Sequence, residues 1–105
     1  MSVIRITENN FNQEVLKSGV PVLLDFWAPW CAPCRMLSPV VDKVGENLDS
    51  RAKVGKINVD EEPGLATQFG IMSIPTLLVI KDGKVVKSSV GVIPEEKIVD
   101  MLKAS

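Results

Sequence analysis

VPVLLDFWAPWCAPC, residues 20–34, is the most informative stretch of this chain. Val20–Trp27 is a nearly continuous apolar run, which is typical of a central strand in a sheet that helices cover on both faces. From Cys31 onward, apolar residues recur at intervals of three and four, which predicts a helix. The stretch therefore predicts a buried strand that leads, through a short turn, into a helix with two cysteines at its start.

The rest of the chain alternates in the same way between strand and helix patterns. Further strands are predicted at 3–6, 54–59, 76–80 and 85–90, and further helices near 7–19, at 61–69 and from Pro94 onward. Thr7 is expected to cap the first of these helices, and Asp82-Gly83 predicts a hairpin between the last two strands. The order β-α-β-α-β-α-β-β-α predicts an α/β fold with a mixed five-stranded sheet and four helices packed on its two faces.

Length and composition predict one compact domain spanning residues 1–105. The chain has 105 residues, of which 46% are hydrophobic and 24% charged, close to the average for a globular domain. Its 12 basic and 13 acidic residues give a net charge of −1 and form no basic cluster. Nucleic acid and anionic membranes are therefore poor candidate partners, and no apolar run reaches the roughly 18 to 20 residues of a membrane span.

Two further features of the sequence limit the kinds of active site that the chain can form and indicate where the protein is located. The chain contains no histidine, which excludes Ser-His-Asp triads, Cys-His proteases and histidine-ligated metal sites. The first residues lack the basic and apolar regions of a secretory signal, so we expect a cytoplasmic, reducing location.

Cys31-Ala32-Pro33-Cys34 is the motif best suited to chemistry. The first turn of a helix offers unpaired N–H groups and the positive end of the helix dipole, which favour a thiolate at Cys31. Residues three apart in a helix face the same side, so Cys34 can form a disulfide with Cys31, and Pro33 suits the first turn. The motif predicts reversible dithiol–disulfide exchange with Cys31 as the nucleophile.

Two other readings of the cysteine pair carry less weight. A zinc site needs further Cys or His ligands, which this chain lacks unless two copies share a metal, so no metal is expected. A purely structural disulfide that closes so short a loop removes little chain entropy and is unusual in a reducing compartment.

Asp25 is a second candidate because it lies within the apolar strand 22–27. Burial without a counter-charge penalises the ionised form and raises the pKa of a carboxyl group. Such a group exchanges protons near neutral pH. The alternative is that Asp25 lies at a solvated end of the strand.

Together, the segment DFWAPWCAPCR at 25–35, Ile74-Pro75-Thr76 and Val90-Gly91 resemble the thioredoxin family. The resemblance covers essentially the whole chain, including its length and element order, and a C-x-x-C near a βαβ pattern is itself a recognised indication of this family. It implies a thioredoxin fold and a general protein-disulfide reductase with a role in electron transport and cell redox homeostasis. It implies no bound cofactor, a monomer, disulfide-containing protein substrates and a thioredoxin reductase partner, either NADPH-flavin or ferredoxin-linked.

The resemblance also implies roles for residues around the cysteines. Asp25 corresponds to a buried aspartate that takes the proton of Cys34, and Lys56 to a lysine that lies near it, although a solvated strand lysine is an equally simple reading of Lys56. Ala32 departs from the glycine usual in the family, and its effect on the reduction potential has no predictable sign. Trp27 is expected to support the site together with Ala32 and Pro33.

A flat apolar groove around Cys31 is implied for substrate binding. Ile74-Pro75-Thr76 resembles the family's cis-proline loop, where the backbone of Ile74 pairs with an extended peptide as an added strand. The residues expected to form the groove or contact substrate are Trp30, Pro33, Ile74, Pro75, Thr76 and Gly91.

Two alternative functions remain open from the sequence. The same groove could dock a partner protein without catalysis, or the protein could act as a more oxidising thiol oxidase or isomerase. Replacing both cysteines by serine separates docking from reduction, and the reduction potential separates a reductase from an oxidant.

Overall fold

The computed structural model describes residues 3–48 and 50–103 of the chain. Five strands form one sheet in the order β1-β3-β2-β4-β5. β3 pairs parallel with β1 and β2, whereas β4 pairs antiparallel with β2 and β5, which confirms the mixed sheet. The strands are β1 (Val3–Arg5), β2 (Val22–Trp27), β3 (Lys53–Asn58), β4 (Thr76–Lys81) and β5 (Lys84–Val90).

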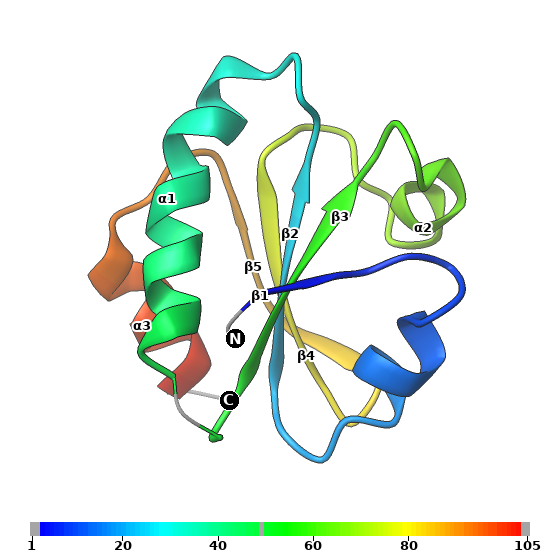
Figure 1. Cartoon of the computed structure of the whole chain (residues 1–105), viewed down its shortest axis with the longest axis vertical. Coiled ribbons are helices and arrows are strands. Elements are labelled where there is room, and N and C mark those ends of the chain that lie inside the picture. Colours follow the sequence, from blue (N-terminus) through cyan, green and yellow to red (C-terminus); the bar gives the residue numbers. More distant parts are fainter. Residues whose placement is uncertain (1–2, 49, 104–105) are drawn as a thin grey trace.

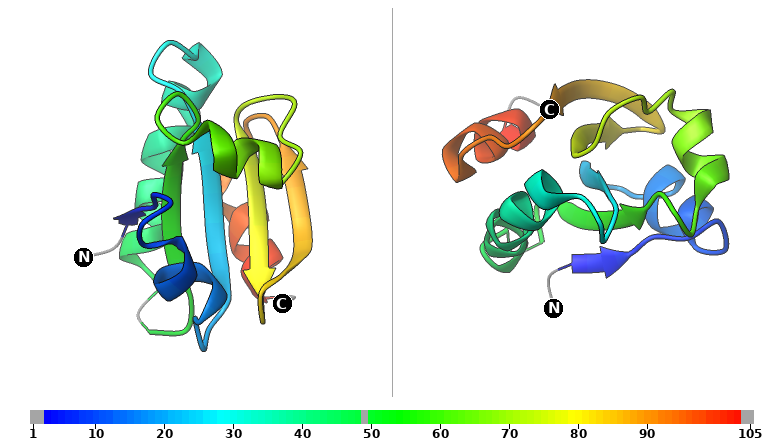
Figure 2. Two further views of the ribbon diagram at one scale, coloured as in Figure 1. Left: turned by 90° about the vertical axis from the view of Figure 1, so that its right-hand side faces the viewer. Right: turned by 90° about the horizontal axis from the view of Figure 1, so that it is seen from above.

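Four helices of the described residues cover the two faces of this sheet, as predicted. α1 (Ala32–Glu46) and α3 (Glu95–Lys103) lie on one face, and α2 (Pro63–Gln68) and the first helix, η1 (Asn12–Leu16), lie on the other (Figures 1 and 2). None of the helices in the described part of the chain is long and apolar enough to cross a membrane.

The central strand β2 supplies both hydrophobic cores. Successive side chains of a strand point to opposite faces, so Leu24 and Phe26 pack in the core beneath η1 and α2, and Leu23 packs in the core beneath α1 and α3. All three are fully buried. The same alternation places Asp25 on the face of Leu23, beneath α1.

The hairpin between β4 and β5 forms where Asp82-Gly83 predicts it. Asp82 has φ +53° and Gly83 has φ +78°. Positive φ at both central residues is the geometry of a type I′ turn, which Asp-Gly adopts readily.

The prediction for the first helix is wrong in its cap and extent. It forms a π-helix over Asn12–Leu16 with Phe11 at its N-cap, and no side chain caps it. Asn10 explains the difference, because its Nδ2 donates to the carbonyl of Arg5 and its Oδ1 accepts from the N–H of Thr7. Asn10 thus closes the turn that precedes the helix, and the Thr7 N–H donates to it instead.

Candidate active site

Cys31 and Cys34 are joined by a disulfide at the start of α1. Their α-carbons are 5.2 Å apart, within the range a disulfide requires. Cys31 is the N-cap of α1, and the backbone N–H of Cys34 donates to its Sγ at 3.2 Å. This N–H is one of the donors that a helix leaves unpaired at its N-terminus, so it can stabilise a thiolate on Cys31 when the bond is reduced. Ala32 and Pro33, both exposed, form the first turn between the two cysteines.

Both cysteines are buried in a small cluster with Ala28. Trp27, at the end of β2, and Ile74 pack against this cluster. The Sγ of Cys31 lies 3.8 Å from the carbonyl oxygen of Ile74, so the loop before β4 directly faces the disulfide.

That loop contains a cis peptide bond between Ile74 and Pro75. The carbonyl of Pro75 accepts from the N–H of Gly91, whose φ of +94° favours glycine. Thr76 is buried, and its hydroxyl donates to the carbonyl of Ser73 at 2.5 Å. The structure therefore brings Ile74, Pro75 and Gly91 together beside the disulfide, with the side chain of Thr76 turned inward.

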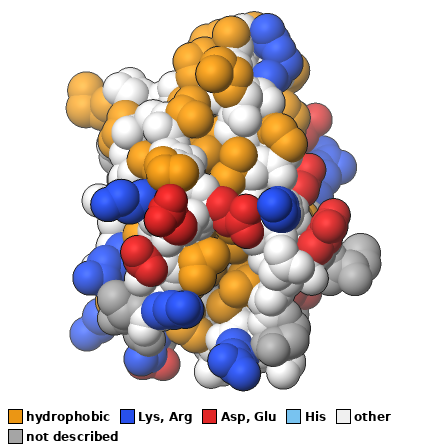
Figure 3. Space-filling model, turned by 90° about the vertical axis from the view of Figure 1, so that its left-hand side faces the viewer, with side chains coloured by type: hydrophobic (Ala, Val, Ile, Leu, Met, Phe, Trp, Pro, Cys, Tyr) orange, Lys and Arg blue, Asp and Glu red, His pale blue; other side chains and the backbone are white. Residues whose placement is uncertain are grey.

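Exposed apolar side chains gather around the disulfide. Trp30 is 68% exposed and Met72 is 94% exposed, and both line a cavity of about 260 Å³ together with Ile74. The indole N–H of Trp30 donates to the carboxylate of Asp60 at 3.1 Å, which holds the ring in place. Figure 3 shows hydrophobic side chains gathered at the end of the molecule where α1 begins, with a basic side chain beside them and further charged side chains below.

Asp25 is only 1% exposed, which supports the reading of a buried acid over that of a solvated strand end. No described residue hydrogen-bonds its Oδ1 atom. Burial raises the pKa of Asp25 from its ordinary value of 3.8 to about 6. The positive charge of Lys56 opposes this rise in pKa, and the negative charge of Asp42 adds to it. A carboxyl group with this pKa can take up or release a proton near neutral pH.

Lys56 is the register neighbour of Asp25 on β3 and is not a solvated strand lysine. Its side chain is 18% exposed, and its Nζ lies 2.8 Å from Oδ1 of Asp42 and 2.6 Å from Oγ of Ser38. Both of these acceptors belong to α1.

Three polar residues of this region were not predicted from the sequence: Ser38, Asp42 and Asp60. One signal could have found the first two, because Cys34, Ser38 and Asp42 are spaced at i, i+4 and i+8 and so share one row of the helix. Asp60 follows β3 in a loop, and nothing in the local sequence pairs it with Trp30.

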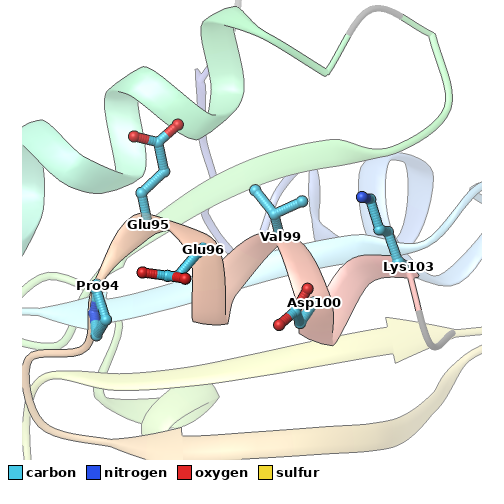
Figure 4. Close-up of a pocket in the computed structure, with 6 residues that line it drawn as sticks. All are labelled: Pro94, Glu95, Glu96, Val99, Asp100 and Lys103. Atoms are coloured by element: carbon cyan, nitrogen blue, oxygen red, sulfur yellow. The ribbon is translucent and has the colours of Figure 1, made fainter.

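A second hollow runs along α3, away from the cysteines. It is lined by Pro94, Glu95, Glu96, Val99, Asp100 and Lys103 (Figure 4). Glu95 in this hollow pairs with Lys43 of α1 at 3.4 Å. No cysteine lines it, so we assign it no part in the redox site.

Comparisons with known proteins agree with this geometry. The family model for thioredoxin matches residues 2–104. Thioredoxin 1 of Synechococcus elongatus is 50% identical over 97 residues, which cover 92% of this chain and 91% of the relative. The thioredoxin of Pyropia yezoensis is 49% identical over 102 residues, 97% of this chain and 95% of the relative. That of Haemophilus influenzae is 43% identical over 100 residues, 95% of this chain and 94% of the relative. With a cysteine pair joined at the start of a helix in an α/β fold, the chain belongs to the thioredoxin family of thiol–disulfide oxidoreductases.

Proposed function

We propose that this protein reduces disulfides in other proteins through Cys31 and Cys34. The observation that carries the proposal is the position of the pair, which forms a disulfide at the N-terminus of α1 beside an exposed apolar surface. The reaction needs only the two thiols, a proton acceptor and a surface that docks the target.

In the first step, the thiolate of Cys31 attacks one sulfur of the target disulfide. A bond forms between Cys31 and that sulfur, the target disulfide breaks, and the other target sulfur leaves as a thiolate. The N–H of Cys34 supports the nucleophile by donating to the Sγ of Cys31.

In the second step, Cys34 loses its proton and attacks the Sγ of Cys31. The Cys31–Cys34 disulfide forms, the mixed disulfide breaks, and the target leaves with both of its sulfurs reduced. Asp25 is the proton acceptor in this proposal, and its raised pKa, about 6, suits proton exchange near neutral pH.

The target docks against Trp30, Ile74 and the backbone around Pro75. The carbonyl of Ile74 lies beside Cys31, so an extended peptide that pairs with this backbone brings its disulfide to the nucleophile. Thr76 contributes by bonding to Ser73 and shaping the loop, and Trp27 packs beneath the cysteines.

The remaining parts of the proposal concern the cellular setting. A reductase partner returns two electrons to the disulfide, either an NADPH-flavin enzyme or a ferredoxin-linked one, and this gives the protein a role in electron transport. The protein works as a monomer, as one domain over residues 1–105. It acts in a reducing compartment such as the cytoplasm, where its dithiol can be kept reduced.

Cysteine variants test the exchange mechanism. We expect Cys31→Ser to abolish reduction of insulin by dithiothreitol-recharged protein, and Cys34→Ser to attack once and remain trapped as a mixed disulfide. Mass spectrometry detects the trapped species, and circular dichroism of each variant checks its fold. Alkylation at neutral pH should label Cys31 first in the reduced protein, and faster labelling of Cys34 would reverse the two roles.

The double variant Cys31→Ser/Cys34→Ser separates this function from docking alone. We expect the double variant to keep any docking of partner proteins and to lose disulfide reduction. If cells that carry the double variant in place of the wild type kept the protein's function, docking alone would account for that function.

A further inference from the structure

The ammonium group of Lys56 is held from one side by α1. Its Nζ donates to Oγ of Ser38 at 2.6 Å and pairs with Oδ1 of Asp42 at 2.8 Å. The side chain of Lys56 is only 18% exposed, whereas that of Asp42 is 49% exposed. A largely buried cation with two fixed acceptors, one helical turn apart, has little freedom to move toward a third.

These acceptors lie on the same helix as the second cysteine, and that helix covers the face of the sheet that carries the buried acid. Cys34, Ser38 and Asp42 form one row on α1. Leu23 and Val54 pack against Leu37 and Val41 of the same helix. Since side chains alternate along a strand, Asp25 and Lys56 lie on this face too, as register neighbours on β2 and β3.

Few other charges face this pair. On β4, the register neighbour of Asp25 is the buried Leu77. On β1, the register neighbour of Lys56 is Arg5, which is exposed and paired with Glu61 at 2.7 Å. The buried residues of α3 are Ile98 and Leu102. Glu61 lines one hollow together with Lys56 and Arg5, but its carboxylate pairs with Arg5. Asp42 is therefore the acidic group that pairs with the Lys56 ammonium among the described residues and competes with Asp25 for it.

We propose that Asp42 and Ser38 are positioning residues that hold Lys56 and thereby set how readily Asp25 takes the proton of Cys34. This inference rests on the proposed role of Asp25 in the release step. Lys56 lowers the pKa of Asp25 and Asp42 raises it, in agreement with this arrangement. Asp42 acts on Asp25 in two ways: directly through its own negative charge, and indirectly by holding the Lys56 ammonium in an ion pair.

A double-mutant cycle separates these two effects of Asp42. The carboxyl group of Asp25 is titrated by carbon NMR in the full chain, in the wild type and in Asp42→Ala, Lys56→Met and the double variant. We expect Asp42→Ala to lower the pKa of Asp25, and most of that shift to disappear when Lys56 is also replaced. An equal shift with and without Lys56, or no shift, overturns the positioning role.

Three further variants sharpen the test. Glu46→Ala removes an exposed acid of the same helix and should leave the titration of Asp25 unchanged, and a shift as large as that of Asp42→Ala would overturn the specific role of Asp42. Asp42→Glu should restore the wild-type titration. Ser38→Ala changes no charge, so it should shift the titration only while Lys56 is present, and the absence of any shift removes Ser38 from the proposal.

The rate of the release step distinguishes this inference from the proposed function. In a single-turnover assay, the pH midpoint of release should move down with the pKa of Asp25 in Asp42→Ala. A titration that moves while release does not would support the positioning of Lys56 and contradict the role of Asp25 as proton acceptor. Normal unfolding curves for each variant show that the fold is intact.

Discussion

Asp25 combines two properties that oppose each other at the scale of a single residue. Its place within β2 buries it almost completely, and burial penalises the ionised form of a carboxyl group. The neighbouring cation, Lys56, offsets only part of that penalty, since the pKa of Asp25 remains raised to about 6. The fold therefore loses stability when Asp25 ionises, while the proposed release step depends on that ionisation.

The pH dependence of stability should reveal this penalty. Because the pKa of Asp25 is 3.8 when unfolded and about 6 when folded, the folded state binds the proton more tightly. The wild type thus loses stability as pH rises from below 3.8 to above 6, by up to about 3 kcal/mol in total. We expect Asp25→Asn to lack this loss, so its stability relative to the wild type should rise by roughly 2 kcal/mol between about pH 4 and pH 8.

Urea titrations of the oxidised proteins at both pH values measure the difference. Asp100→Asn, which removes an exposed carboxylate on α3, is the control and should follow the wild type. The same Asp25→Asn protein should also release its target more slowly. A pH dependence equal to that of the wild type would contradict the raised pKa of Asp25.

The site residues differ in how far the sequence could predict them. The positions of the proposed nucleophile, Cys31, of its partner, Cys34, and of the buried Asp25 follow from local patterns: cysteines at a helix start, and one charge in an apolar strand. The cis bond at Pro75 depended on the family resemblance, because an X–Pro bond is usually trans. The spacing of Ser38 and Asp42 from Cys34 could have drawn attention to both residues, but their contact with Lys56, which lies on a different element, is not visible in a sequence pattern.

At the scale of elements, proline and glycine marked the boundaries that could be predicted. α2 begins at Pro63, and Gly70, with φ +64°, follows its end. The N-terminal helix has no proline at its start, and Gly19, which was expected to end it, lies three residues beyond its last residue, Leu16. A side chain outside its apolar pattern, Asn10, decides where it begins, and the pattern of Phe11 and Val15 fits an α-helix and a π-helix equally well.

Gly55 is required by the packing of Ile6 against strand β3. It lies in β3, between β1 and β2, and a Cβ atom there would lie 2.6 Å from Cγ1 of Ile6. Ile6 is itself only 1% exposed, so it cannot move aside freely. We expect Gly55→Ala to lower the free energy of unfolding by about 1 to 3 kcal/mol.

Gly19→Ala is the matched control for Gly55→Ala in urea denaturation. A Cβ atom at Gly19 meets nothing within 4 Å, and the φ of Gly19 is not positive. Its replacement should change stability by less than about 1 kcal/mol. If the two variants were equally stable, the close approach of Ile6 to β3 would not be the reason why residue 55 is a glycine.

At the scale of the whole molecule, the topology gathers four connections at one end of the sheet. The loops after β2 and β3 carry the disulfide and Asp60, and because β4 runs antiparallel to β2, the loop before it brings Ile74 to the same end. Thr76 pairs with Val90, so the end of β5 adds Gly91. The order of strands and helices predicted from the sequence is consistent with these loops meeting at one end of the sheet. The contacts among the loops, in contrast, cannot be predicted from the sequence.

The reduction potential depends on how stable the whole oxidised protein is relative to the whole reduced protein. Its value decides whether the protein acts as a reductase or as an oxidant. Strong oxidants in this class owe their high potential to extra stabilisation of the reduced form, as a cation beside the thiolate provides. Here the Sγ of Cys31 accepts from a neutral N–H, and the guanidinium of Arg35 donates to the carbonyl of Pro29 at 2.8 Å. We expect a potential near about −270 mV, measured against glutathione buffers, and an oxidised form more resistant to urea than the reduced form. A potential near about −120 mV, with the reduced form more stable, would contradict the reductase and indicate a thiol oxidant.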